Sequence, residues 1–151
     1  MRLFHLKREA VTIEPDIREK DEALERLIRL VCDVYHIDDC DTVYRLIIDR
    51  EGRLSTGIGL EVAVPHCRIG NVKRIVAGAM LLPNGIDYNS VDGLPVKLII
   101  LLLSPESDIR GHLACLSSIS HTVSDERLRG KLLSRKEESE LFDIIRETIQ
   151  G

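Results

Sequence analysis

The sequence predicts a single α/β domain whose β-sheet lies between layers of helices. A chain of 151 residues is long enough for one domain and too short for two of ordinary size. Segments with helical periodicity occur in the first and last thirds of the chain, with strand-like segments between them. One of these strands, over 97–103, is apolar at every position from Leu98, which is typical of a strand covered on both faces.

Composition and charge argue against several functional classes. With 44% hydrophobic and 30% charged residues, the chain has the balance of a folded, soluble protein rather than a disordered one. The net charge of -4 argues against a general nucleic-acid or anionic-membrane binder, because such proteins carry a cationic excess. The longest uncharged apolar run, 98–103, is too short to span a membrane.

The N-terminus and the cysteines indicate a cytoplasmic protein. Residues 1–10 are charged and contain no apolar segment of the kind found in secretory signals. The cysteines stand at positions 32, 40, 67 and 115, and no two of them form a Cys-x-x-Cys pair. We therefore expect reduced thiols rather than a disulfide framework.

Two helices are predicted in the first third of the chain. Apolar residues recur at helical spacing over 22–35, and charged residues lie between them. A second helix is predicted over 42–51, because the aspartates at 38, 39 and 41 supply an N-cap and Gly52 supplies a stop. Its predicted buried stripe is Val43, Leu46 and Ile47.

Three strands and then three helices are predicted in the rest of the chain. The strands cover 62–64, which a proline ends, 75–82, which a Pro-Asn-Gly turn at 83–85 ends, and 97–103, which a Ser-Pro pair ends. The helices are predicted over 112–123, 124–133 and 137–150. Ser134 and Glu137 have the spacing of a capping box before the last helix.

His66 is the first candidate for chemistry. It follows the strand that Pro65 ends, so we expect its ring at a strand end, on a loop, where α/β folds bind ligands. An unprotonated imidazole is a good nucleophile near neutral pH. The alternative is that His66 is a surface or capping residue without a chemical role.

Arg50 and Thr56 are candidates for binding an anion. Arg50 extends the stripe that begins at Val43, and a guanidinium at the edge of an apolar face needs an anionic partner. A phosphoryl group suits its planar fork, and the alternative is an ion pair with an aspartate or glutamate. Thr56 lies in the flexible turn 55–59, which matches neither phosphate-loop nor dinucleotide spacing. We expect Thr56 to bind phosphate together with Arg50.

His112 is the third candidate. It begins the helix that follows the apolar strand, and it shares one side of that helix with apolar residues, so it faces inward. The helix N-terminus should keep its ring neutral, and its N–H could bond a bound phosphate. The alternative is a hydrogen bond between His112 and a neighbouring carbonyl.

Six segments between the second predicted helix and the helix at His112 form a recognisable pattern. They are Arg50-Glu51, Ser55-Thr56-Gly57-Ile58-Gly59, Val62-Ala63-Val64-Pro65-His66, Asn84-Gly85-Ile86-Asp87-Tyr88, Asp92-Gly93-x-Pro95-Val96 and His112-Leu113-x-x-Leu116. This pattern resembles the IIA phosphocarrier domains of the bacterial phosphoenolpyruvate-dependent phosphotransferase system, in the type 2 class of fructose, mannitol and nitrogen-regulatory proteins.

The resemblance implies one such domain over 1–151, with a mixed β-sheet flanked by helices on both faces. It implies a phosphotransferase in which His66 accepts the phosphoryl group, Arg50 helps to bind it and His112 is a second active-site imidazole. The donor would be a phosphohistidine carrier protein, and the acceptor a IIB subunit or a regulated target protein. It implies no cofactor, no metal, no nucleic acid and no insertion into a membrane.

Two branches of this family and two other classes compete. The Arg-Glu-x-x-x-Ser-Thr-Gly-Ile-Gly spelling favours the nitrogen-regulatory branch over a sugar-specific IIA subunit for fructose- or mannitol-type uptake. A binding module with this fold and no phosphoryl transfer is a further alternative. A zinc protein would use His66, Cys67, His112 and Cys115, whose spacing fits no common zinc pattern.

The chain departs from the family pattern at two places. Cys67 stands where glycine or alanine is usual, and Leu60-Glu61 stands where Asn-Gly is usual. We expect the Cys67 thiol to share the cleft of His66, so that its modification obstructs a docking donor.

Overall fold

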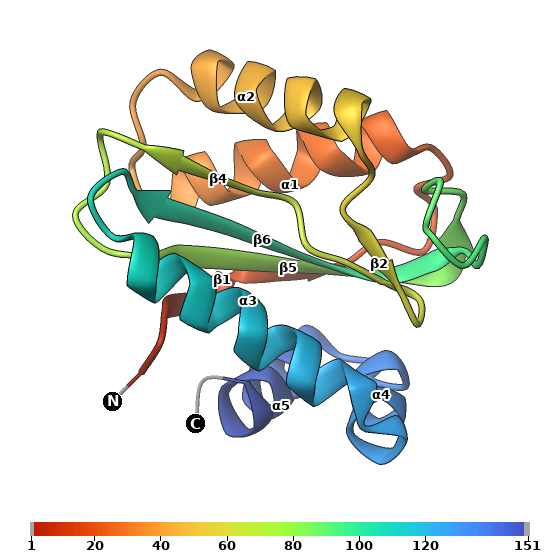
Figure 1. Cartoon of the computed structure of the whole chain (residues 1–151). Helices are drawn as coiled ribbons and strands as arrows, with labels where there is room; N and C mark the ends of the chain where they lie inside the picture. The colour runs from red at the N-terminus through yellow and green to blue at the C-terminus, as the bar shows by residue number, and fades with distance from the viewer. Residues whose placement is uncertain (1, 150–151) are drawn as a thin grey trace.

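Residues 2–149, which the computed structural model describes, form a mixed sheet of six strands with helices on both faces (Figure 1). The predicted fold class is confirmed. The elements are β1 (His5–Ile13), α1 (Lys20–Val34), α2 (Cys40–Arg53), β2 (Gly57–Gly59), β3 (Val62–Ala63), β4 (His66–Ile69), β5 (Val76–Ile86), β6 (Val96–Pro105), α3 (Ile109–Ser124), α4 (Glu126–Leu133) and α5 (Glu138–Thr148).

Strand β6 is the centre of the sheet. The strand order is β1-β5-β6-β3-β2, and β4 also pairs with β6. Strand β5 runs antiparallel to β6, whereas β1 runs parallel to β5 and both β3 and β4 run parallel to β6. Along one edge of β6 the partner therefore changes from β3, opposite Leu98 and Ile99, to β4, opposite residues 102–105.

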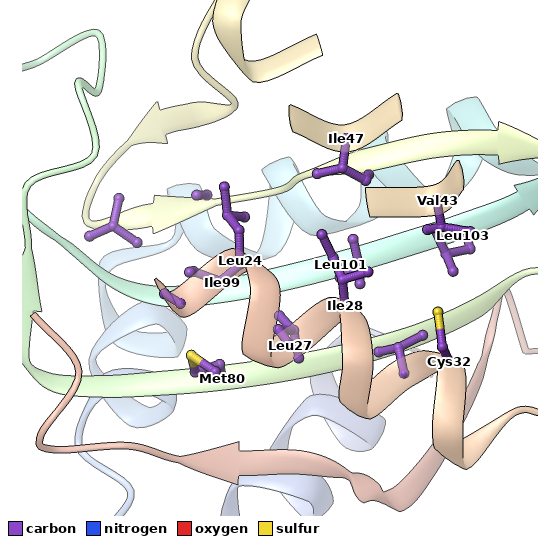
Figure 2. Close-up of a cluster of buried hydrophobic side chains, with 14 of the residues drawn as sticks. Leu24, Leu27, Ile28, Cys32, Val43, Ile47, Met80, Ile99, Leu101 and Leu103 are labelled. Carbon is purple, nitrogen blue, oxygen red and sulfur yellow. The ribbon is translucent and has the colours of Figure 1, made fainter. Parts of the chain in front are cut away.

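Two hydrophobic cores lie on the two faces of the sheet. Helices α1 and α2 cover one face, where they pack on Ile99, Leu101 and Leu103 of β6 (Figure 2). Helices α3, α4 and α5 cover the other face, where the alternate residues Leu98, Ile100 and Leu102 point. The predicted apolar strand is thus buried on both faces, as its sequence indicated.

The predicted helices all form, with differences at their ends. Asp39 caps α2 by accepting the Thr42 N–H, as expected, but Gly52 does not stop this helix, which ends at Arg53. Leu46 was expected in the buried stripe and is 43% exposed. The predicted end of the last helix at Gln150 lies outside the described residues.

The predicted capping box is wrong. Ser134 ends α4 and donates its hydroxyl to the Lys131 carbonyl, and Glu137 precedes α5 without a side-chain cap bond. The local spacing fits the motif, but the turn between the two helices already uses Ser134.

Strands β1 and β5 differ most from the prediction. β5 continues through 83–85 to Ile86, because pairing with β6 resumes after a shift of register between Leu81 and Ile86. β1 was not predicted at all. It is an edge strand with a register shift between Leu6 and Val11, so its burial does not alternate regularly.

Two of the cysteines are joined, contrary to expectation. Cys32, near the end of α1, forms a disulfide with Cys40, the first residue of α2, and their Cα atoms are 6.0 Å apart. The short connection between the helices brings these ends side by side. Cys67 and Cys115 are free thiols.

The small residues of β5 allow α1 to approach the sheet. A Cβ on Gly78 would collide with Val31 of α1 and would lie 3.1 Å from the Ala10 carbonyl oxygen. Gly78→Ala should therefore lower the free energy of unfolding in urea by about 1–3 kcal/mol. Gly52→Ala in helix α2 is the matched control, because a Cβ at this position meets no atom within 4 Å. Since alanine favours a helix more than glycine does, this variant should raise the free energy of unfolding by about 0.5–1 kcal/mol. Equal stability of Gly78→Ala and the wild type would show that α1 does not pack closely against β5 at Gly78.

Candidate functional site

His66 is the first residue of β4 rather than part of a free loop. The chain passes through Pro65 from β3 to β4, and His66 pairs with Leu102 of β6. Its ring Nδ1 lies 2.6 Å from the carbonyl oxygen of Val64. Because a carbonyl can only accept, Nδ1 carries the proton, and the hydrogen bond assigns the free lone pair to Nε2. The half-buried His66 therefore has one nucleophilic nitrogen.

His112 lies beside His66. The two ring centroids are 5.1 Å apart with the ring planes tilted by 57°. His112 was expected to begin its helix. Helix α3 begins instead at Ile109, after the cap residue Asp108, so His112 is the fourth residue of the helix. It does face inward, as predicted, and its Nδ1 lies 2.7 Å from the hydroxyl of fully buried Ser104. From the sequence, Ser104 was expected only to end the strand over 97–103.

The surroundings of His112 favour its neutral form. Burial is the main cause that lowers its pKa, with further lowering from the charges of His66 and Arg68, while Asp108 opposes them. The expected direction is thus correct, but burial is its first cause. Arg68 was missed by sequence analysis. It lies two residues after His66 on β4, so both side chains leave the same face of the sheet.

Arg50 occupies the last turn of α2. The residue is half-buried, and its guanidinium donates to the Leu54 carbonyl at 2.6 Å. The alternative to anion binding was an ion pair with an aspartate or glutamate. Among residues 2–149, no such ion pair is observed for Arg50. Its hydrogen-bond partner is a backbone oxygen, which leaves the positive charge of the guanidinium unneutralised.

Thr56 is buried with both of its donors engaged. Its N–H donates to Glu51 Oε1 at 3.1 Å and its hydroxyl donates to Glu51 Oε2. Glu51 also forms an ion pair of 3.0 Å with Lys20 of α1. The sequence held a signal for Glu51 that was not used: with Val43 and Ile47 it continues a stripe at four-residue spacing.

A run of hydrogen bonds connects Thr56 to His66. The Thr56 carbonyl accepts the N–H of Val64 at 3.0 Å, and the Val64 carbonyl accepts the Nδ1–H of His66. The turn that contains Thr56 thus contributes to holding the His66 ring in one orientation and one tautomer.

Cys67 lies on the opposite face of the sheet from His66. It pairs with Leu103 and packs into the core beneath α1 and α2, where burial raises the pKa of its thiol to about 12. The expectation that this thiol shares the cleft of His66 is wrong, because successive residues of a strand point to opposite faces. Cys67 is a packing residue of that core.

Within residues 2–149, no cluster of three or more histidine, cysteine, aspartate or glutamate side chains is arranged to hold a metal ion. None of the helices in this part of the chain has the length and apolar character needed to cross a bilayer.

A sheet layered between helices is a fold that this chain shares with solved structures of IIA proteins. The nitrogen regulatory protein IIA-Ntr from Neisseria meningitidis has a TM-score of 0.85 at 26% identity, over 93% of this chain and 95% of that chain. IIA mannitol from Escherichia coli shares the fold, with a TM-score of 0.78 at 18% identity over 94% of this chain and 99% of that chain.

Sequence relatives include both branches. A nitrogen regulatory protein of Pseudomonas aeruginosa is 30% identical over 132 residues, 87% of this chain and 86% of that protein. The fructose-specific EIIA component of Haloferax volcanii is 29% identical over 142 residues, 94% of this chain and 92% of that protein. Residues 4–148 match the family described as "Phosphoenolpyruvate-dependent sugar phosphotransferase system, EIIA 2", and the chain belongs to this family.

The environment of His112 predicts a measurable titration. Its pKa should lie below 6.5, and Arg68→Gln should raise it by removing a nearby positive charge. Because the pKa of His112 is lower in the folded state than in the unfolded state, the unfolded chain binds a proton first as the pH falls. The free energy of unfolding should therefore decrease as the pH falls through about 6.5. An NMR titration of the ring protons checks the pKa, and an unchanged value in Arg68→Gln would contradict the assigned influence.

Proposed function

We propose that this protein is a phosphohistidine carrier that accepts a phosphoryl group on Nε2 of His66. The observation that carries the proposal is the 2.6 Å hydrogen bond from His66 Nδ1–H to the Val64 carbonyl. It fixes the lone pair on the other nitrogen of a half-buried ring, which is what a nucleophile for phosphorus requires.

The transfer balances without a general base. The bond between phosphorus and the donor's histidine nitrogen breaks, that nitrogen keeps the electron pair, and the lone pair of His66 Nε2 forms the new bond. The proton on His66 Nδ1 stays on that nitrogen throughout, hydrogen-bonded to the Val64 carbonyl. Because little covalent chemistry is left to the protein, alignment and charge neutralisation supply the catalysis.

His112 and Arg50 serve the bound phosphoryl group. We assign His112 the tautomer in which the Ser104 hydroxyl donates to Nδ1, so that the neutral ring carries its proton on Nε2 and offers it to a phosphoryl oxygen. Arg50 supplies a charge that no carboxylate neutralises among residues 2–149. Thr56, whose donors bind Glu51, supports the site rather than the phosphate.

The donor in this proposal is a phosphohistidine carrier protein. Large apolar side chains flank His112 on α3: Ile109 is 55% exposed and Leu113 is 59% exposed. Exposed apolar residues beside a reactive group suit docking of another protein. They support a protein donor, as does the absence of phosphate-loop spacing in the sequence.

The nitrogen-regulatory branch is the function that we propose, with signalling by the phosphorylation state. The Neisseria and Pseudomonas proteins support it. The second candidate is a sugar-specific IIA subunit that hands phosphate to a IIB subunit, which the Haloferax relative favours. Enzyme IIA-mannitol of Escherichia coli, which shares the fold at 17% identity, has been solved in complex with phosphorylated enzyme IIB-mannitol.

His66→Ala should fold normally and take up no phosphate. The wild type, incubated with phosphoenolpyruvate and the general phosphotransferase proteins, should gain one phosphate by intact mass, labile to acid and stable to hydroxide. His121→Ala, which changes an exposed histidine of α3, is the matched control and should behave as the wild type. Phosphate uptake by His66→Ala would show that another residue is the acceptor. If the wild type also took up no phosphate, the alternative of a binding module without phosphoryl transfer would be favoured. Adding a fructose-type IIB protein to the phosphorylated chain separates the two branches by whether the phosphate leaves.

Arg50→Lys should slow transfer in both directions by about 10- to 100-fold, because lysine keeps the charge but loses the planar fork. The measurement is the rate of phosphate gain and loss by mass, alongside urea unfolding, which should remain close to wild type. Unchanged rates would assign Arg50 to capping the end of α2 through the Leu54 carbonyl.

A further inference from the structure

Glu51 is a buried carboxylate to which the proposed chemistry assigns no role. Its side chain is only 5% exposed, and it collects three donors: Lys20 Nζ at 3.0 Å, the Thr56 N–H at 3.1 Å and the Thr56 hydroxyl. A buried charge is costly unless it is fully paired, so this arrangement holds its neighbours firmly in place.

The same cluster extends to a second loop. The hydroxyls of Thr56 and Tyr88 are 3.1 Å apart, and Tyr88 is almost completely buried. Lys20 Nζ lies 4.2 Å from the centroid of the Tyr88 ring and 3.3 Å from the Tyr88 carbonyl oxygen, which also accepts from Ser55 at 3.0 Å. Segment 54–57 is therefore held on two sides, by the hydrogen bonds of Thr56 with Glu51 and by those of Ser55 and Thr56 with Tyr88.

We infer that Glu51 is a positioning residue that holds both Arg50 and the nucleophilic tautomer of His66 in place through segment 54–57. This inference rests on the proposed function. The contact toward Arg50 is the Leu54 carbonyl, which accepts the guanidinium at 2.6 Å.

The contact toward His66 runs through the backbone. Glu51 holds the Thr56 N–H, the Thr56 carbonyl holds the Val64 N–H at 3.0 Å, and the Val64 carbonyl holds the Nδ1–H of His66 at 2.6 Å. These three bonds fix the positions of Thr56 and Val64, so a displaced Thr56 shifts the Val64 carbonyl that orients the His66 ring. Glu51 directs its charge at Lys20 and Thr56, so its role is to orient the site rather than to bind the phosphoryl group.

The substitution that tests this role is Glu51→Gln. Glutamine has nearly the same shape, but its neutral amide leaves Lys20 without a counter-charge and cannot accept on both terminal atoms. Thr56→Val is a second variant, which removes the hydroxyl contacts with Glu51 and Tyr88 but keeps the bond from the Thr56 N–H to Glu51. Glu61→Gln is the matched control, because Glu61 pairs with Lys97 at 3.2 Å in a partly exposed ion pair.

Two readouts are measured on each full-length protein once its folding is verified by its NMR spectrum. The ring nitrogen shifts of His66 report the tautomer, and intact mass reports the rate of phosphate gain. Glu51→Gln should mix the two tautomers and slow phosphate gain by about 10- to 100-fold, with a smaller change in Thr56→Val and none in Glu61→Gln. Combining Glu51→Gln with Arg50→Lys should slow the reaction by less than the product of the two single effects, because both act through one arrangement.

The outcomes separate the two proposals. A wild type that takes no phosphate overturns the proposed function, while the tautomer measurement still tests Glu51. A folded Glu51→Gln with the wild-type tautomer and rate overturns the positioning role. If Glu51→Gln does not fold, the same pair of unchanged readouts in Thr56→Val overturns it.

Discussion

The pairing of strand β6 determines where everything else in this protein lies. β6 is buried on both faces, so each helix layer takes its position from alternate residues of one strand. Along one edge its partner changes from β3 to β4, and Pro65 stands at the change. Proline cannot donate to a ladder, but its carbonyl still accepts the Leu102 N–H at 3.1 Å. The chain is thereby held against β6 while it changes direction, and His66 resumes the ladder with its ring held by the Val64 carbonyl.

The candidate site uses backbone geometry where many histidine sites use a carboxylate. A carbonyl fixes the tautomer of His66 without adding a negative charge that would repel a phosphoryl group. The buried carboxylate of the motif, Glu51, faces Lys20 and Thr56 instead. Arg68 is one of the charged groups that act on the histidine pair. Burial is the largest cause that lowers the pKa of His112, and the charge of Arg68 lowers it further. In the proposed function, this arrangement suits a phosphoryl group that is bound and then released.

Much of the architecture follows from local sequence. The helical periodicity over 22–35, the cap at Asp39 and the apolar strand over 97–103 each depend on residues within one element, and each forms as predicted. The inward direction of His112 follows from its spacing on one helix. The motif segments that identified the family are local in the same sense, because a motif records residue types at fixed spacing.

Tertiary structure decided the features that depend on distant partners. β1 is recognisable only through its pairing with β5, because an edge strand with an irregular register has no alternating pattern. The strand does not end at 83–85 as expected. Residues 82–85 form an irregularity without pairs to β6, with Gly85 at a φ of 70°, and pairing resumes at Ile86. Cys67 faces away from His66 because the chain at His66 is already a strand, whereas the sequence indicated a loop. Ser104 became visible only when folding brought it to His112, because a hydrogen bond between separate elements leaves no periodic trace in the sequence. The burial of Glu51 follows from its spacing with Val43 and Ile47, but its partners Lys20 and Thr56 were supplied only by the tertiary structure.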